Sequence, residues 1–363
     1  SSFTTLDVSN WNMTGVKLMA GMFTGCDQLT VIDTKDWDMS EVTNINAMFQ
    51  SCTAMIDLQV IDWDVAKVEN MNNFVNFCTI ATAPCGAGQT NSLLYCGRVF
   101  KECPNLHTAE VAGWDMTQVE SAYDMFMDCY ALANIDTSLW SFPLLENATN
   151  MFKSCTDLTT LDTSNWGMGS VTLAPGIFHY CSALEFSSGA TPLVLTSLGA
   201  TGVSNWTTSS VNYMVRAFED CRQLTHIDVR TWDTSSVLNM DQAFQRCYDL
   251  EFSSGTTDFD VSSWDVALVT NMDHTFAFCT SLNTLDISLW TTTSLEECGW
   301  MFYDVRVSSL DVTNWDVSNV IDMEGVFFRT DITSIDVSNW DTSNVVKMRK
   351  VFGDCDQLTS ITW

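Results

Sequence analysis

Basic residues are scarce in this 363-residue sequence: 15 Lys and Arg stand against 45 Asp and Glu, which gives a formal net charge of −30. A chain this acidic repels nucleic acid and anionic membranes, and it attracts cations and basic partners. The sequence also lacks an apolar run of about 18 residues, the minimum for a membrane-spanning helix. We therefore expect neither a nucleic-acid partner nor a membrane span.

Motifs of known chemistry are missing as well. The four His residues occupy unrelated positions, and no Gly-x-Ser-x-Gly sequence or phosphate-binding loop is present. No Cys-x-x-Cys pair or Cys/His pair has the spacing of zinc ligands. The sequence therefore predicts a protein that is not an enzyme and holds no cofactor.

Trp recurs at an interval of 25 or 26 residues over most of the chain. The members are Trp11, Trp37, Trp63, Trp114, Trp140, Trp166, Trp206, Trp232, Trp264, Trp290, Trp315 and Trp340. The gap after Trp63 spans two periods, and Phe100 and Cys103 still lie where a repeat that lost its Trp near Gly88 would place them. A fixed period predicts one repeat array over residues 1–363, with an irregular repeat at 79–103 and insertions at about 185–200 and 251–257.

Each repeat combines two periodicities. Apolar residues five and three positions before Trp flank an Asp, which is the alternation of a short strand. After Trp, the apolar positions follow at spacings typical of one helical face, as in Val42, Ile45, Met48, Phe49 and Cys52. A unit this small buries its apolar face only by stacking. We therefore predict an α/β repeat fold: a leucine-rich-repeat-like solenoid of about 13 repeats, each with one short parallel β-strand and a helical turn.

The combined pattern M-F-x-x-C-x-x-L and L-D-x-S-x-W-D-x-S-x-V-x-x-M, clearest over residues 333–355, resembles a known family. It is similar to the BspA-type leucine-rich repeats of microbial and protist surface proteins, in their 25-residue Trp-Asp variant. The resemblance implies an extracellular or cell-surface location and an adhesive or structural role without enzymatic activity.

Stacking turns each repeat position into a row of side chains. The strand Asp row consists of Asp7, Asp33, Asp136, Asp162, Asp228, Asp260, Asp286, Asp311 and Asp336. Neighbouring carboxylates repel by roughly 1 kcal/mol in water, so either Ser and Thr hydroxyls two residues away or a bridging divalent cation such as Ca²⁺ must offset the repulsion. The post-Trp Asp row is predicted to cap the turn that follows it, and it consists of Asp38, Asp64, Asp115, Asp233, Asp265, Asp316 and Asp341.

Trp and Cys also form rows, which we interpret as core. The Trp rings should point inward, with the indole N–H bound to turn carbonyls, although exposed indoles would instead suit sugar stacking. Eleven Cys residues share one register and are expected to be small buried hydrophobes. Cys85 and Cys96 flank the repeat that lost its Trp, where a disulfide would imply an oxidising compartment.

Several exposed features remain as binding or modification candidates. Asn12, Asn147 and Asn205 begin glycosylation sequons. Both insertions open with Leu-Glu-Phe-Ser-Ser-Gly, so Glu185, Phe186, Glu251 and Phe252 lie in loops that either confer binding specificity or are tolerated bulges.

The two ends of the sequence suggest self-association. Phe3 and Leu6 lie in the first strand, Leu358, Ile361 and Trp363 lie in the last, and neither end shows a polar capping repeat. We expect a structural subunit of a surface filament that assembles head to tail. The alternative is an adhesin that recognises a basic protein, a glycan or a divalent cation through its acidic strand face and insertion loops.

Overall fold

The computed structural model describes residues 4–60, 62–83, 90–163, 165–184, 208–225, 227, 229–230, 232–251 and 259–363. Its contacts divide the chain into two compact units: unit 1 comprises Ser1–Val171 and Tyr180–Leu184, and unit 2 comprises Thr172–His179 and Glu185–Trp363. Both units repeat the same coil, and the single domain expected from the repeat stays a prediction. Expectations for Phe3, Cys85, Glu185, Phe186, Asn205, Asp228 and Phe252 lie outside the described residues.

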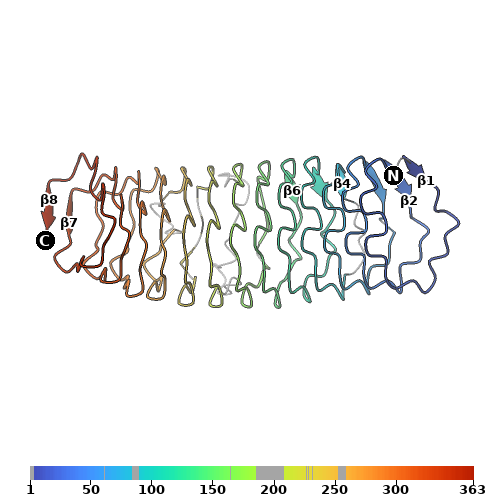
Figure 1. Cartoon of the computed structure of the whole chain (residues 1–363), viewed down its shortest axis with the longest axis horizontal. Coiled ribbons are helices and arrows are strands. Elements are labelled where there is room, and N and C mark those ends of the chain that lie inside the picture. The colour runs from blue at the N-terminus through green and yellow to red at the C-terminus, as the bar shows by residue number, and fades with distance from the viewer. Residues whose placement is uncertain are drawn as a thin grey trace. The chain divides into compact units, whose positions relative to one another are not determined.

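Short parallel strands stack one repeat apart within each unit (Figure 1). In unit 1, β1 (Thr5–Leu6), β2 (Val31–Asp33) and β3 (Asp57–Gln59) form one sheet, and β4 (Thr82–Ala83), β5 (Thr108–Ala109) and β6 (Asn134–Ile135) form another. In unit 2, β7 (Ser334–Asp336) pairs with β8 (Ser360–Thr362). Leu6 pairs with Ile32, and Ile32 pairs with Leu58. In these rungs the expected strand lies where the alternation of apolar residues places it, but the described residues between β6 and β7 form no strand, so a strand in every repeat is not observed.

A second column of parallel bridges runs along the opposite side of each coil. In unit 1 it joins Leu18, Asn44, Asn70, Tyr95, Ser121 and Asn147. In unit 2 it joins Leu173, Tyr213, Asn239, Asn271, Glu297, Asp322 and Lys347. Rungs whose strands pair are thus joined to their neighbours by main-chain pairing at two places.

The expected helical turn is wrong, because the described residues contain no helix. Beyond the second bridge the main chain alternates two kinds of hydrogen bond. Met48 N donates to Ile45 O within the rung at 3.2 Å, whereas Ile45 N and Ala47 N donate to Asn70 O and Asn72 O of the next rung at 3.0 and 2.8 Å. Consecutive tight turns produce the same apolar spacing as a helix while pairing the backbone between rungs.

Two residues per rung adopt a left-handed conformation that no helix accommodates. In the second rung they are Ala47 at φ 54° and Ser51 at φ 60°, and Gly21 and Gly25 hold the same places in the first. The sequence carried a signal for this, since glycine, Asn and Asp are the residues that most readily adopt positive φ.

Stacked aromatic rings fill the core of both units. The rings of Trp11 and Trp37 lie 5.9 Å apart and those of Trp37 and Trp63 lie 6.2 Å apart, all nearly parallel. A parallel column of Phe rings runs beside them, as for Phe218 and Phe244 at 5.3 Å. Each rung buries its large rings against the next, so the surface chemistry is left to the rows that point outward.

Candidate functional site

The strand Asp row is exposed or half-buried between buried neighbours, and most of its carboxylates accept a hydrogen bond from the N–H two residues later. These are Asp7, Asp33, Asp136, Asp260, Asp286, Asp311 and Asp336. Asp136 Oδ1 accepts hydrogen bonds from Ser138 N at 3.0 Å and Ser138 Oγ at 2.7 Å. Asp311 makes the same contacts with Thr313 at 3.0 and 2.6 Å. These are Asx turns, in which an acceptor two residues earlier replaces a backbone partner. Ser and Thr therefore do bind the carboxylates, on the C-terminal side.

The post-Trp Asp row builds an identical turn. Asp233 Oδ1 accepts bonds from Ser235 N at 3.1 Å and Ser235 Oγ at 2.6 Å. Asp115 and Asp316 bind Thr117 and Ser318 in the same way. The acceptor thus stabilises a turn, although no helix follows it.

The sequence analysis missed a third set of Asx turns, at the second bridge column. Its acceptors are Asn44, Asn70, Asn147, Asn239, Asn271 and Asp322, each bound to the N–H two residues later. The recurrence of Asn seven positions after Trp was the available signal.

Hydrogen bonding keeps many of these carboxylates ionised. Ser138 lowers the pKa of Asp136 through its side chain and then its N–H, and Ser288 does the same for Asp286. Ser235 and Ser318 likewise lower the pKa of Asp233 and Asp316. Since a lowered pKa favours the charged form, these four carboxylates are ionised at neutral pH.

Basic residues are distributed unevenly around the coil. We define the strand side as the residues from eight before to five after each Trp, and the turn side as those from six to seventeen after it. The strand side contains both Asp rows but only Lys35, Lys67 and Arg230 as basic residues. The other twelve lie on the turn side: Lys17, Arg98, Lys101, Lys153, Arg216, Arg222, Arg246, Arg306, Arg329, Lys347, Arg349 and Lys350.

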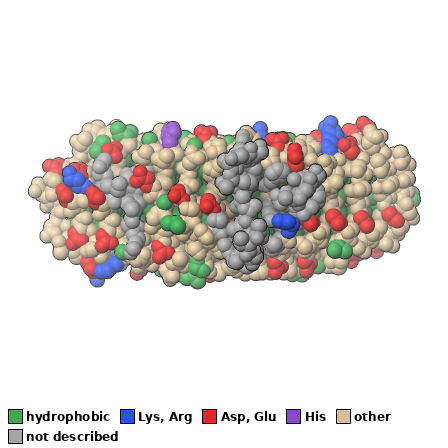
Figure 2. All heavy atoms as spheres, turned by 180° about the vertical axis from the view of Figure 1, so that it is seen from behind, with side chains coloured by type: hydrophobic (Ala, Val, Ile, Leu, Met, Phe, Trp, Pro, Cys, Tyr) green, Lys and Arg blue, Asp and Glu red, His purple; other side chains and the backbone are tan. Residues whose placement is uncertain are grey.

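Lys35 and Lys67 on the strand side are paired with acidic residues. Lys35 Nζ lies 3.3 Å from Asp33, and Lys67 Nζ lies 2.5 Å from Glu41. Acidic side chains recur across the face shown in Figure 2 and outnumber the basic ones. The strand side therefore presents ionised carboxylates with almost no cations to neutralise them.

The expected divalent cation has no defined ligand cage in the structure. Within the described ranges, no group of three or more His, Cys, Asp or Glu side chains could hold a metal ion. Ca²⁺ bridging between rungs stays a prediction, for which an unchanged melting temperature on addition of EDTA would be the contrary result.

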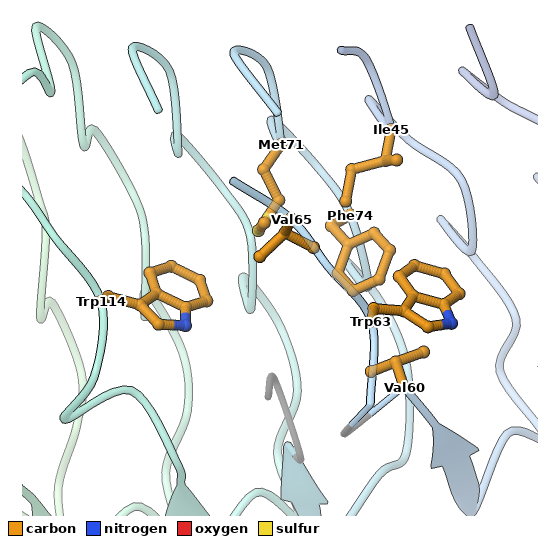
Figure 3. A pocket seen from close by; sticks show the side chains of 7 residues that line it. All are labelled: Ile45, Val60, Trp63, Val65, Met71, Phe74 and Trp114. Atoms are coloured by element: carbon orange, nitrogen blue, oxygen red, sulfur yellow. The ribbon is translucent and has the colours of Figure 1, made fainter. Parts of the chain in front are cut away.

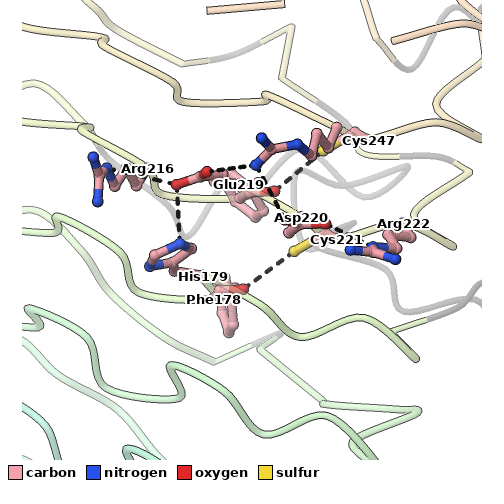
Figure 4. Close-up of polar contacts among 10 residues, drawn as sticks. Phe178, His179, Arg216, Glu219, Asp220, Cys221, Arg222 and Cys247 are labelled. Carbon is pink, nitrogen blue, oxygen red and sulfur yellow. Dashed lines mark hydrogen bonds and ion pairs between the residues drawn. The ribbon is translucent and has the colours of Figure 1, made fainter. Parts of the chain in front are cut away.

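Buried charges gather at one place in unit 2, which the sequence analysis missed (Figure 4). Glu219 is 4% exposed, and its Oε2 lies 2.9 Å from His179 Nε2. Arg246 Nη1 bridges Glu219 Oε1 at 3.2 Å and Asp220 Oδ2 at 3.3 Å. Burial raises the pKa of Glu219, but the hydrogen bond and charge of His179, aided by Arg216 and Arg246, outweigh it and leave that pKa lowered.

This cluster is a network of ion pairs that joins side chains of neighbouring rungs. Arg222 Nε adds a contact of 2.6 Å to Asp220 Oδ1. Removing one partner of a buried, hydrogen-bonded ion pair destabilises the fold strongly, because the other charge is left buried without a partner. The charges are thus already directed at one another, and the arrangement is structural.

The Trp and Cys rows face the core. Trp63 Nε1 donates to Thr34 O at 3.1 Å, and Trp290 Nε1 donates to Val261 O at 3.0 Å, both on the preceding rung. Cys thiols donate to a Phe carbonyl one rung back, as from Cys129 to Phe100 at 3.0 Å. Burial raises the pKa of the Cys52 and Cys181 thiols to about 12. Among the described residues, the buried Trp rings leave no face open to a sugar, and Trp11 of the first rung is 42% exposed.

Cys96 takes the place of a core Met. It is fully buried, and burial raises the pKa of its thiol. Since Cys85 lies outside the described residues, the disulfide stays a prediction. Of the sequon residues, Asn12 is exposed and Asn147 is half-buried, and each accepts a bond from its own Thr N–H. Glu251, at the start of the second insertion, is exposed.

The interrupted Trp ladder leaves a small apolar cavity in unit 1 (Figure 3). Val65 and Met71 lie between Trp63 and Trp114 in that view, and Ile45, Val60 and Phe74 complete the lining. Its volume of about 10 Å³ is enough for roughly one water-sized sphere. The cavity is too small for a substrate.

A larger cavity lies over the rung of residues 337–363 in unit 2. Its volume is about 580 Å³, and Trp340, Met348, Phe352 and Trp363 contribute apolar lining. Trp363 is 84% exposed and Met348 is 48% exposed. At the opposite end of the sequence, Leu18 is 71% exposed in the first rung of unit 1. Leu6, Leu358 and Ile361 are half-buried.

A family model described as "Mycoplasma protein of unknown function, DUF285" matches residues 1–87, 88–190, 195–261, 251–327 and 301–361. No curated protein matches the chain. The description of this family does not mention BspA-type repeats, so the resemblance to them stays an expectation.

Three solved structures show some similarity to the chain. A leucine-rich repeat protein from Bacteroides ovatus is 15% identical, with 95% of this chain and 88% of that chain covered and a TM-score of 0.32. The TLR13–ssRNA13 complex is 12% identical, with 95% and 45% covered and a TM-score of 0.29, so the chain spans less than half of that protein. The plant peptide hormone receptor RGFR1 in complex with RGF2 is 12% identical, with 93% and 70% covered and a TM-score of 0.14.

Proposed function

The chain belongs to the DUF285 family, whose description names no activity, and from the geometry of the coil we propose that it is a non-enzymatic binding scaffold. Its partner is a basic protein segment, and its binding surface is the strand side. The observation that carries this proposal is the pair of Asp rows, ionised and almost without basic neighbours.

Electrostatics favours this partner. Carboxylates stacked one strand spacing apart, about 4.8 Å, repel one another, and a cationic chain laid along the rows relieves that repulsion. The Asx bonds hold each Asp in place before binding, so little side-chain entropy is lost in the complex. Selectivity follows from charge, since the same field repels acidic partners.

Binding of a labelled oligolysine peptide tests the proposal. The strand-side variant Asp286→Asn/Asp311→Asn/Asp336→Asn removes three charges but keeps an acceptor for each turn, as Asn does at Asn44 and Asn147. The matched turn-side variant Asp249→Asn/Asp354→Asn/Asp356→Asn removes three exposed charges elsewhere in unit 2.

We expect the strand-side variant to bind at least tenfold more weakly than the turn-side variant at low salt. Affinity for the unmodified chain should also fall steeply with salt concentration. Equal affinity of the two variants would contradict the proposal, because net charge alone would then explain binding.

A second candidate is the structural subunit of a surface filament. It is favoured by the pairing between rungs, since the main chain of one rung bonds to that of the next and a stack of this kind grows by adding rungs. Sedimentation velocity over a concentration series checks it, and an unchanging monomer up to 100 µM would contradict it.

An extracellular or cell-surface location is part of both proposals. It is supported by the resemblance to surface repeat proteins and by the sequons at Asn12 and Asn147. Surface biotinylation of the source cells, with glycan analysis at the two Asn residues, tests the location. A chain recovered only from the unlabelled fraction would contradict it.

A further inference from the structure

Three aromatic side chains interrupt the repeat on the turn side of unit 2. Trp300 lies ten residues after the Trp of its repeat, and Tyr303 and Phe328 lie thirteen residues after theirs. None of the other repeats has a Trp, Tyr or Phe at either place. All three rings belong to rungs with a described rung on each side, so the cluster is an internal feature of unit 2.

The three rings pack against one another at steep angles. The centroids of Trp300 and Phe328 lie 5.5 Å apart with 78° between the ring planes. Tyr303 lies 5.4 Å from Trp300 and 5.3 Å from Phe328, inclined by 60° and 56°. Trp300 and Tyr303 are half-buried, and Phe328 is 8% exposed. Trp300 and Phe328 therefore form a corner, which Tyr303 supports from within the cluster.

Glycines in the following rungs make room for both rings of this corner. A Cβ on Gly325 would lie 2.5 Å from Trp300 Cε3, and a Cβ on Gly353 would lie 2.8 Å from Phe328 Cδ2. Trp300 also adopts φ 56°, a left-handed conformation that is costly for a bulky residue. Strained residues persist where their surroundings hold them, and they are concentrated at binding sites.

A cation already lies on this corner. The ammonium of Lys350 is 4.9 Å from the centroid of Phe328 and 5.7 Å from that of Trp300, within the range of cation–π attraction. Its neighbours Lys347 and Arg349 pair with carboxylates at 2.7 and 3.7 Å. Among the described residues, no carboxylate lies within ion-pair distance of Lys350 Nζ, so the two rings are its electrostatic partners.

We propose that the corner of Trp300 and Phe328 is a recognition site for a methylated lysine side chain of a partner peptide, which replaces Lys350 there. A primary ammonium is strongly hydrated, so leaving water offsets much of what the rings contribute. Methyl groups bury the charge in apolar surface, so a trimethylammonium group loses less hydration and packs better on the rings. The site lies on the turn side, and the inference does not rest on the cationic partner of the strand side.

Ligand-observed NMR titration of the full chain with three short peptides tests the inference. Each peptide has one variable residue between glycines: trimethyllysine, lysine, or the neutral isostere in which carbon replaces the methylated nitrogen. We expect the trimethyllysine peptide to bind roughly threefold or more tightly than either of the others. Equal binding of the charged and neutral isosteres would overturn the inference, because cation–π attraction would then contribute nothing. Equal binding of lysine and trimethyllysine would overturn the preference for methylation.

Two charge-matched variants test whether Lys350 occupies the site. Lys350→Ala vacates the corner, and Lys17→Ala removes the same charge from an exposed place in unit 1. The trimethyllysine peptide should bind Lys350→Ala roughly threefold or more tightly than it binds Lys17→Ala. Equal affinities would contradict occupation by Lys350, because net charge alone would then account for any gain.

Removal of a ring locates the site. Trp300→Leu should abolish binding of the trimethyllysine peptide, whereas Tyr130→Leu, which removes a ring that is 47% exposed in unit 1, should leave it unchanged. Undiminished binding to Trp300→Leu would overturn the assignment. If a lowered urea midpoint shows that Trp300→Leu is misfolded, Trp300→Phe keeps a ring with a weaker attraction for cations and should bind less tightly than the unmodified chain. Unchanged affinity in that variant would equally contradict the site.

Discussion

At the residue scale, up to three Asx acceptors per rung explain why Asp and Asn recur outside the core. A short polar side chain binds its own backbone two residues on, so each corner of the coil is set locally. Sequence spacing predicted that Asp would lie outside and that Trp and Cys would lie inside. It predicted turn carbonyls as the partners of the indole N–H, but it did not predict that these carbonyls, and those bound by the Cys thiols, belong to the preceding rung.

Asp136 separates the turn-forming role of this row from its charge. Asp136→Ala removes the acceptor of two hydrogen bonds and should cost about 1 kcal/mol of unfolding free energy. Asp136→Asn keeps an acceptor and should cost less than half as much. Urea unfolding of the two variants compares them, and equal losses would show that charge, not the turn, matters for folding.

The buried cysteines should behave as structural thiols. Cys129→Ala removes both a packed sulfur and the bond to Phe100 O, so we expect a loss of about 2 kcal/mol. Cys26→Ala, at a half-buried place in the first rung, is the matched control and should cost less. Urea midpoints report the difference, and a neutral Cys129→Ala would contradict a role for the thiol ladder.

At the element scale, the strand was predictable and the turn side was not. Alternation over Ile335, Asp336 and Val337 specifies a strand uniquely. The spacing of Ile45, Met48, Phe49 and Cys52 is shared by a helix and by a series of tight turns. Only the residues with positive φ distinguish the series of turns from a helix. Many of these positions carry residues other than Gly, Asn or Asp, such as Arg98 and Phe278, so the sequence signal for the turns is weak in any one rung.

Gly325 shows how tightly the turn side is packed. It has φ 62°, and an added Cβ would lie 2.5 Å from Trp300 Cε3. Gly325→Ala should therefore destabilise the chain by about 2 kcal/mol. Gly167→Ala meets no atom within 4 Å and should be nearly neutral.

Combining Gly325→Ala with Trp300→Ala isolates the steric part of this cost. The double variant should lose less than the sum of the two single variants, because the clash disappears while the backbone strain remains. Strict additivity in urea unfolding would show that Trp300 does not limit this position.

At the scale of the whole molecule, a net charge of −30 makes pH and salt the dominant external variables. Charge segregation between the strand and turn sides was readable from the sequence once the repeat was aligned. The ion-pair cluster around Glu219 was not, because its members come from three rungs separated by an insertion.

Asp273 gives a pH dependence of definite sign. Burial raises its pKa to about 7 from 3.8, so the folded chain holds this proton more tightly than the unfolded chain. Stability should consequently fall as pH rises from about 4 to 7. Asp273→Asn should remove that dependence and raise the urea midpoint at pH 8 more than at pH 5, whereas Asp311→Asn should not. An equal gain at both pH values would contradict the assignment.

Carboxyl footprinting tests the central claim most directly. Carbodiimide-driven amidation of the chain, with and without bound oligolysine, is quantified at each carboxylate by mass spectrometry. The acidic strand side predicts at least threefold protection of Asp286, Asp311 and Asp336, with Asp249, Asp354 and Asp356 unchanged. Equal protection of both sets, or protection confined to the turn side, would contradict a partner surface formed by the Asp rows.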